Sequence, residues 1–260
     1  SSDSKIFNID SRKVLTLLRV LYSETENKTI PGKIDDYENE IFRVWSQEWP
    51  VLRRSFSFRN AGGEIDYVHS GIKFDVQILN SNIRTDIHES FNPDHIETFI
   101  IADIANLVPT TFRRFIWRYG ADAIAGRKNF YDLVELFLLV NADNAVAKND
   151  EFIISSVAKL FRTPNDCAFL KNDLLATGEN RYSLINPVDP LVAISVFIKA
   201  PELAKSFSQE LFVSSIQFLW AERRHEFLFL AIYSIDVNSP FTSIIVSEIK
   251  KIILPFEIYT

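Results

Sequence analysis

Hydrophobic residues recur at helical spacing along most of the chain. In residues 11–24 the apolar positions that share one helix face are Val14, Leu17, Leu18 and Leu21, and Ser11 is expected to cap this helix. A second helix is predicted over residues 35–49 and should stop before Pro50. From Pro93 onward one helical segment follows another. The pattern therefore predicts a mainly α protein.

Polar residues, prolines and glycines between these segments mark where the helices should begin and end. The expected caps are Asp94, Thr110 or Thr111, Asp150 and Ser239 at amino ends, and Gly120 as a left-handed residue at a carboxyl end. Pro109 should end the helix before it, and Pro240 suits a first helical turn.

Residues 54–79 have a different pattern, in which apolar and polar positions alternate. The segments SFSFRN, EIDYVHS and IKFDVQIL each show the two-residue period of a half-buried strand. Ala61-Gly62-Gly63 and Ser70-Gly71 separate them as turns, and the earlier ENKTIPGK is expected to be a loop because of its Pro-Gly pair. We therefore expect two or three short strands that form a small β-hairpin subdomain near residues 54–79.

The spacing of the helices indicates how they are arranged. Helix starts lie roughly 16 to 22 residues apart, so a helix pair takes about 35 to 40 residues, which is the period of α-solenoids. No fixed repeat motif accompanies this period. The fold expected is mainly α, an irregular α-solenoid or large helical array. Residues 1–92 should hold the N-terminal helices and the β subdomain, and residues 93–260 the array.

Composition and charge restrict the classes of function. The net charge of −6 disfavours a general polyanion-binding surface, although it leaves room for a local basic patch. Cys167 is the single cysteine, which excludes an internal disulfide and favours a reducing, cytoplasmic setting. No apolar run reaches the ~18 residues that span a bilayer, and the first residues lack the pattern of a signal peptide.

The stretch FRRFIWRYGADAIAGRKNF, residues 112–130, concentrates aromatic and basic side chains around two glycines. It does not match a phosphate-binding loop, because Gly120 to Gly126 is one residue too long and a predicted helix precedes it. Two interpretations remain. The stretch is a tight joint between two packed helices, in which Arg127 and Lys128 pair with Asp132 or Glu135. Alternatively, its basic residues bind phosphates.

A second basic cluster lies in WPVLRRSFSFRN, where Trp45, Trp49 and Leu52 should pack inward while the arginines face outward. An anionic ligand could bind between the two clusters if they meet in space. The candidate nucleic-acid-binding residues are Arg53, Arg54, Arg59, Arg113, Arg114, Arg118, Arg127 and Lys128.

Other constellations are less suited to chemistry. His88, Asp94, His95 and Glu97 are metal-ligating residue types, but they lack the HExxH spacing and Asp94 suits a helix cap. The strand acids Glu64, Asp66 and Asp75 loosely resemble those of restriction-type nucleases, but Gln77 stands where the lysine should follow. Cys167 and His225 fit a buried thiol and a charged helix junction. No catalytic residue, metal site or cofactor is predicted.

Three stretches resemble a known group of proteins. WSQEWPVLRRSFSFRN, FRRFIWRYGADAIAGRKNFYDLVELFLLV and LKNDLLATG are similar to helical regions of large bacterial conflict-system proteins, including anti-phage systems, that are associated with GTPases or STAND-type ATPases. The resemblance covers about a quarter of the chain, and it implies a scaffold or sensor module. The chain has no Walker A motif, so the nucleotide-hydrolysing part would lie elsewhere.

The function expected is that of a non-enzymatic helical module, bacterial and cytoplasmic, that binds a protein partner. Recognition would use an exposed groove of aromatic and basic residues, with Arg and Trp as anchors. Two alternatives stay open: a nucleic-acid-binding protein that uses the Arg clusters, and a metal-dependent nuclease or hydrolase that uses the acids of the hairpin.

Overall fold

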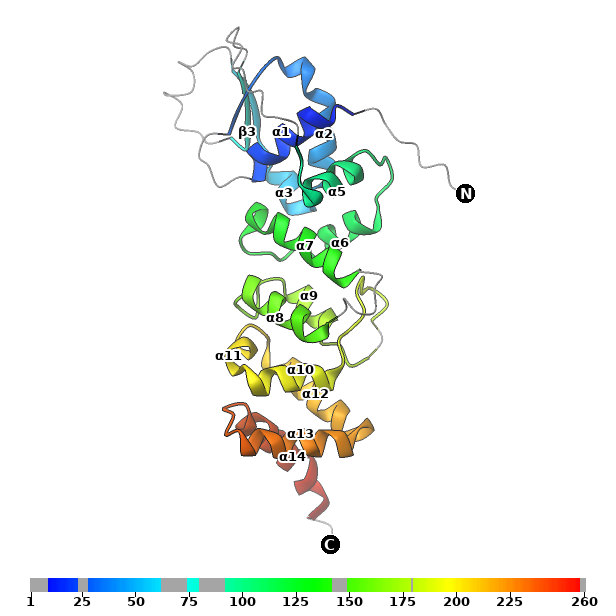
Figure 1. Ribbon diagram of the computed structural model, residues 1–260, viewed down its shortest axis with the longest axis vertical. Helices are drawn as coiled ribbons and strands as arrows, with labels where there is room; N and C mark the ends of the chain where they lie inside the picture. The colour runs from blue at the N-terminus through cyan, green and yellow to red at the C-terminus, as the bar shows by residue number, and fades with distance from the viewer. Residues whose placement is uncertain are drawn as a thin grey trace, which may run out of the picture. The chain divides into compact units, whose positions relative to one another are not determined.

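The computed structural model describes residues 9–22, 28–61, 74–79, 92–141, 149–178 and 180–257. The chain is mainly helical with one small sheet, as the periodicity predicts (Figure 1). It divides into two compact units, Ser1–Glu135 and Leu136–Thr260. The expected division at residue 92 thus falls inside the first unit, because the helix that follows it packs against the N-terminal helices.

The first unit combines helices with three short strands. Its elements are α1 (Ser11–Tyr22), β1 (Thr29–Pro31), η1 (Ile34–Asp36), α2 (Glu38–Gln47), α3 (Pro50–Ser55), β2 (Phe58–Ala61), β3 (Val76–Leu79), α5 (His95–Ile104), α6 (Thr111–Tyr119) and η2 (Gly126–Asn129). Helix α7 (Phe130–Val140) begins in this unit and ends in the second.

The sheet differs from the predicted hairpin. Its strand order is β1-β3-β2, and both pairs are parallel, with Ile30 opposite Ile78 and Phe58 opposite Val76. The hairpin prediction is wrong because alternation reveals a strand but not the direction of its neighbour. The expected loop at Pro31 contains β1, and the segment EIDYVHS lies outside the described residues.

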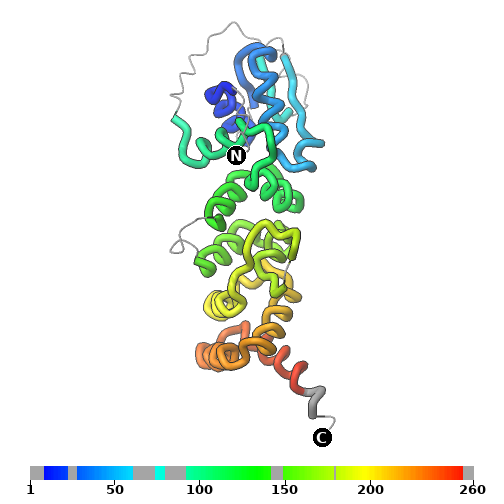
Figure 2. Tube along the Cα trace, turned by 90° about the vertical axis from the view of Figure 1, so that its right-hand side faces the viewer, coloured from blue at the N-terminus to red at the C-terminus, as the bar shows by residue number. Residues whose placement is uncertain are grey.

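Helix α1 lies at the centre of the first unit. This helix, dark blue in Figure 2, contacts α2, α5, β1 and β3. The side chains of Val14, Leu17 and Leu18 are buried there. Phe112, Phe115, Ile116 and Tyr119 on α6 are also buried, as the sequence predicts. These contacts turn one apolar stripe of each helix into a shared core.

The predicted helix caps are partly confirmed. Asp94 forms a full capping box with Glu97, and Thr110 caps α6. Two caps lie one residue earlier than expected. Asp10, not Ser11, accepts hydrogen bonds from the first N–H groups of α1. Asn149, not Asp150, caps α8 (Asp150–Leu160) in the second unit. Asp and Asn accept such bonds as readily as Ser, so composition alone does not separate neighbouring candidates.

Gly120 does not adopt the predicted left-handed conformation, since its φ angle is −78°. The glycine is required for space instead. A Cβ atom at this position would lie 2.6 Å from ring carbons of Trp49 and from the carbonyl oxygen of Ile116. The left-handed glycine of this joint is Gly126, with a φ angle of +59°.

The regular secondary structure of the second unit is helical in its described residues. Its elements are α8 (Asp150–Leu160), α9 (Ala168–Leu174), α10 (Pro190–Lys199), α11 (Pro201–Ala204), α12 (Gln209–Glu222), α13 (Arg224–Asp236) and α14 (Thr242–Glu257). Helix α10 contacts α8, α11, α12 and α13, while α12, α13 and α14 contact one another. Phe197 on α10 is buried with its ring centroid 5.3 Å from that of Phe207 and 4.9 Å from that of Phe212. Some of the chain's 22 phenylalanines therefore build this core.

Candidate functional site

A groove of about 660 Å³ lies on the first unit, and we call it the aromatic groove. It is lined by Ile34, Glu38, Asn39, Ile41, Phe42, Trp45, Phe56 and Phe58. Positions 38, 41, 42 and 45 follow helical spacing, so α2 presents them on one face. Phe56 and Phe58 are two residues apart in extended chain, which places both rings on the same side. The alternating SFSF segment therefore supplies the second wall.

Two aromatic side chains of the groove are unusually exposed. Phe42 is 59% exposed and Phe58 is 51% exposed, although both have a large apolar surface. The ring of Phe42 lies 5.6 Å from that of Trp45, and the rings of Phe56 and Phe58 are 6.4 Å apart. The groove thus offers a cluster of aromatic surface that a bound apolar group would remove from water.

The Arg53 side chain lies against this cluster. Its guanidinium carbon is 4.7 Å from the ring centroid of Trp117 and 5.9 Å from that of Trp45. Both indoles are held by their N–H groups, Trp45 to the carbonyl oxygen of Arg53 at 3.1 Å and Trp117 to that of Gln47 at 2.9 Å. Among the described residues no direct ion pair is formed by Arg53, although the Glu48 carboxylate is close enough for Arg53 to lower its pKa. The guanidinium is therefore a positioned cation that can accept an anionic partner.

Acidic side chains border the groove as well. Asp35 and Asp36 are exposed on η1, directly before the groove-lining helix, and Glu38 is exposed within the lining. The next cation on α3, Arg54, is exposed. The groove consequently carries both signs of charge and is not a continuous basic surface.

The predicted cationic cluster is divided by the structure into cations that reach solvent and cations that do not. Arg113 is only 4% exposed and pairs with the carboxylate of Asp103, which also accepts a bond from Gln47 at 2.8 Å. The Arg113 guanidinium also donates to the carbonyl oxygen of Asp103 at 2.7 Å. Arg113 is therefore a core residue and not a phosphate ligand. In the sequence, Asp103 is the one acid within the apolar stripe of residues 96–107, and this position could have predicted a buried ion pair.

Arg127 is likewise held by acids, although not by the predicted partners Asp132 or Glu135. Its guanidinium donates to the Glu48 carboxylate at 2.7 Å and also pairs with Asp75. Burial raises the pKa of Glu48, and the pairing with Arg127 opposes that shift. Arg127 thus fixes η2 to the segment between α2 and α3 and to the residue before β3.

The remaining predicted cations have separate environments. Arg59 lies over the ring of Phe74 at 5.7 Å, and Arg118 lies over that of Tyr119 at 5.5 Å. Arg114 and Lys128 are exposed. The basic cluster around Arg53 and the stretch of residues 112–130 do meet in space. They meet where Arg53 lies over the ring of Trp117, and not by bringing their arginines together.

The predicted acidic and metal-ligating candidates do not assemble into a catalytic site within the described residues. Glu64, Asp66 and His88 lie outside those residues. Asp75 accepts hydrogen bonds from the N–H and the hydroxyl of Ser57 in addition to its pair with Arg127. Cys167 is buried, and no described group of three or more His, Cys, Asp or Glu residues is placed to hold a metal ion.

Glu97 connects a helix cap to α1. Its carboxylate accepts from Arg19 at 2.8 and 3.0 Å and from the N–H of Asp94 at 3.0 Å. The hydrogen bonds from Arg19 hold the pKa of Glu97 below its ordinary value, against the opposing effect of burial. The folded-state pKa is therefore lower than the unfolded one, so this interaction stabilises the fold above the unfolded pKa and is lost as the pH falls through the folded pKa.

We expect Glu97→Gln to lower the unfolding free energy at pH 7 by about 1–3 kcal/mol, because it removes a charged acceptor from Arg19 and from the cap. The difference from wild type should shrink below about pH 4.5, where the unfolded carboxyl is protonated. Urea unfolding at several pH values measures it, with the exposed Glu135→Gln as the control. A deficit that stays constant from pH 7 down to about pH 3, well below the ordinary pKa of a glutamate, would contradict this role.

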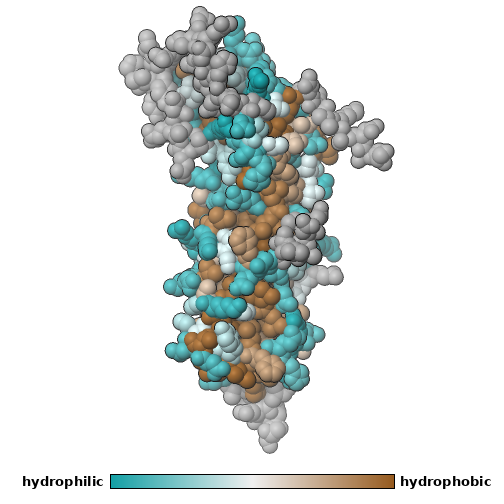
Figure 3. Space-filling view, in the orientation of Figure 1, coloured by the Kyte–Doolittle hydropathy of each residue, from teal (hydrophilic) through white to brown (hydrophobic). Residues whose placement is uncertain are grey.

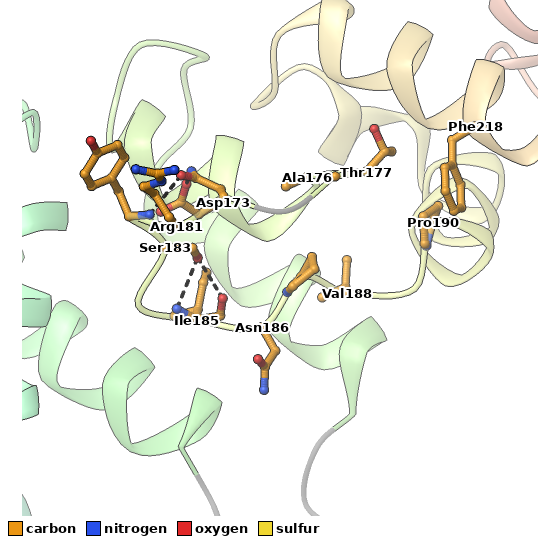
Figure 4. A pocket seen from close by; sticks show the side chains of 14 residues that line it. Asp173, Ala176, Thr177, Arg181, Ser183, Ile185, Asn186, Val188, Pro190 and Phe218 are labelled. Atoms are coloured by element: carbon orange, nitrogen blue, oxygen red, sulfur yellow. Dashed lines mark hydrogen bonds between the residues drawn. The ribbon is translucent and has the colours of Figure 1, made fainter.

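A second cavity, of about 1030 Å³, lies in the second unit along residues 173–190 (Figure 4). Asp173, Arg181 and Ser183 are near one end of it, and Pro190 and Phe218 near the other. Two hydrogen bonds hold the loop at this cavity: Asn180 donates to Asp173 of α9 at 2.6 Å, and the Ser183 hydroxyl donates to the carbonyl oxygen of Ile185 at 2.7 Å. These bonds shape the loop, and they leave the aromatic groove as the better candidate site.

Comparisons with protein-family models, with curated proteins and with solved structures find no match to this chain. Within the described residues, no helix combines the length and the apolar character needed to cross a membrane. The function is therefore inferred from the geometry of the groove and from the chemistry of its side chains.

Proposed function

We propose that this chain is a non-enzymatic protein-interaction module and that its aromatic groove binds an extended segment of a protein partner. One observation supports this above all: aromatic side chains line an open groove directly beside a positioned arginine that makes no direct ion pair among the described residues. Aromatic residues and arginine are the side chains that most often carry the binding energy of protein interfaces.

The groove fits a bulky apolar side chain of the bound segment. Its volume of about 660 Å³ accommodates such a side chain together with adjoining backbone. Burying one large apolar side chain contributes about 1.5–3 kcal/mol, and it would cover the exposed rings of Phe42 and Phe58 at the same time. The partner segment should therefore carry Phe, Trp, Leu or a similar residue at this position.

Arg53 adds a requirement for charge. The Arg53 guanidinium lies over the ring of Trp117, with the ring of Trp45 farther away at 5.9 Å. A guanidinium presents several N–H donors in one plane, which suits bidentate binding of a carboxylate. Little side-chain entropy is lost on binding because the arginine is already positioned. The segment that fits best carries an acidic residue next to the bulky apolar one.

A nucleic acid fits this site less well. A phosphate backbone brings one negative charge per nucleotide, and it would have to pass the exposed acids Asp35, Asp36 and Glu38. Two of the predicted phosphate ligands, Arg113 and Arg127, are already engaged with acids. A peptide brings only one or two charges and can place them beside Arg53 alone. Nucleic-acid binding is therefore an outcome that the experiment must distinguish.

Two features of the chain support a scaffold role beyond the groove. Three stretches, about a quarter of the chain, resemble helical regions of bacterial conflict-system proteins, and the lone, buried Cys167 suits a reducing cytoplasm. Helices α8, α10 and α12 to α14 pack successively against their neighbours in the second unit, which supports an irregular α-solenoid there.

Selection of a random peptide display library on the purified chain tests the proposal. We expect enriched peptides to carry a bulky apolar residue next to Asp or Glu. Their Kd, measured by fluorescence anisotropy, should rise about tenfold for Phe58→Ser and for Arg53→Gln, because each removes roughly 1.4 kcal/mol of binding energy. A mixed-sequence RNA oligonucleotide at about 50 mM salt is the competing probe.

Phe152→Ser is the matched control, since Phe152 is also an exposed phenylalanine but lies on α8, outside the groove. It should leave peptide affinity unchanged. Peptides that bind all variants equally would show that the groove is not the site. Salt-sensitive binding of the RNA that depends on Arg53, without peptide binding, would replace the protein partner by a nucleic acid.

A further inference from the structure

Helix α13 is apolar on two opposite sides. Phe227, Ala231 and Ser234 form its buried side against the rest of the second unit. The apolar residues exposed on α13 are Leu228, Phe229, Ile232, Tyr233 and Ile235, with Phe229 76% exposed and Ile232 57% exposed. Figure 3 shows brown, hydrophobic surface in this part of the second unit. A helix with apolar residues on both sides is typical of one that is covered on both.

The centre of the exposed side has a definite order of side chains. His225, Phe229, Ile232 and Asp236 follow one another at spacings of four, three and four residues, which places them in one stripe along the helix. The stripe begins with a hydrogen-bond donor, continues with two apolar side chains and ends with a carboxylate. It spans about 16 Å, given a rise of 1.5 Å per residue.

A shallow groove of about 520 Å³ continues this surface toward α10. Leu191 and Val192 of α10 line it together with Phe229, Leu230 and Tyr233 of α13. The charges around the groove are paired: Lys199 lies 3.6 Å from Glu151, and Arg223 binds both Glu226 and Asp189. Apolar contact, and not a free charge, would therefore hold an occupant of this surface.

We propose that the occupant is a second copy of this chain, whose α13 pairs antiparallel with this one about a two-fold axis between residues 230 and 231. In that register Phe229 lies against Ile232 of the second copy, and His225 lies against Asp236 of the second copy. Every contact then occurs twice, as a two-fold interface requires. A parallel pair would instead bring the two Asp236 carboxylates together, which is unfavourable.

The predicted dimer is weak and reversible. One helix face with its adjoining groove covers less than the roughly 800 Å² per partner of a standard interface, so micromolar dissociation is expected. Dimerisation would give each particle two aromatic grooves and so raise the avidity for a partner that displays two segments. The two surfaces share no residue, so the pairing of α13 does not depend on what the aromatic groove binds.

Light scattering of the chain over roughly 2–200 µM, a range that brackets micromolar dissociation, tests the pairing. We expect the mass to rise from 29.9 kDa toward twice that value with concentration. Phe229→Glu should keep the chain monomeric throughout. Phe152→Glu introduces the same charge at an exposed phenylalanine of α8 and should dimerise as the wild type does.

A charge exchange tests the register. Asp236→Lys alone and His225→Asp alone should each weaken the dimer several-fold, because the first removes the acceptor that faces His225 and the second places two carboxylates together. The double variant carries both substitutions, so the new carboxylate at position 225 faces the new ammonium at position 236 of the second copy, and the affinity should be restored. Both changes also suit the helix dipole, so loss of the fold is not expected.

A chain that is monomeric at every concentration would overturn the proposal and assign the surface to a different protein. A dimer that survives Phe229→Glu would place the interface elsewhere and also overturn it. Failure of the double variant to restore the dimer that each single variant weakens would overturn the antiparallel register.

Discussion

Replacing Arg127 with methionine should lower the unfolding free energy of the first unit by about 3–5 kcal/mol, because it leaves a buried carboxylate without its partner. The Glu48 side chain is fully buried, and Arg127 is the cation that donates to it, at 2.7 and 3.3 Å. The same change removes the ion pair with Asp75, directly before β3. Urea unfolding followed by tryptophan fluorescence measures the loss, since Trp45, Trp49 and Trp117 all belong to this unit.

The neighbouring residue provides the control. Lys128 is exposed, so Lys128→Met should change the unfolding free energy by no more than about 0.5 kcal/mol. Adding Glu48→Gln to Arg127→Met should recover part of the loss, because the unpaired charge is then removed. Equal stability of the two methionine variants would show that the pair contributes little. It would also return Arg127 to the set of cations available for a ligand.

Replacing Gly120 with alanine should destabilise the first unit by about 3 kcal/mol, at the upper end of the usual cost of overpacking. The added Cβ would lie 2.6 Å from ring carbons of Trp49, whose side chain is itself buried and cannot move aside without disturbing the core. The shift should appear as a lower urea midpoint with an unchanged slope.

Gly178→Ala is the matched control for this substitution. A Cβ at Gly178 meets no heavy atom within 4 Å, and its backbone φ angle is not in the left-handed region. This change should be neutral or slightly stabilising, since alanine restricts the unfolded chain. Similar behaviour of the two alanine variants would show that contact with Trp49 is not what requires a glycine at position 120.

Gly120 and Arg127 both belong to the stretch of residues 112–130, in which a structural joint and a binding surface are combined. Gly120 packs against Trp49, Arg127 forms an ion pair with Glu48, and Arg113 is buried beside Asp103. Trp117 of the same stretch supports Arg53 at the aromatic groove. The two interpretations of the sequence thus apply to different residues: most of the stretch is structural, while one of its side chains positions a candidate ligand-binding cation.

The sequence by itself determined the local elements of this protein. Apolar spacing predicted the helices and the buried side of α6, including Phe115 and Tyr119, and polar residues before the apolar runs predicted the caps Asp94 and Thr110. These features depend on neighbours within about four residues, so a periodic pattern contains the necessary information. The alternation in SFSF also predicted the extended segment that forms one wall of the aromatic groove. The alternation did not predict that this segment lines a groove.

Only the tertiary structure decided which distant residues meet. Arg127 pairs with Glu48, 79 residues away, and not with the acids that follow it in sequence. The strands pair in parallel through β3, and Arg53 stacks on Trp117 of another helix. A charged or aromatic side chain has similar affinity for many partners, and local periodicity does not choose among them. The packing of the whole core makes that choice, because it determines which side chains lose water together and must satisfy one another there.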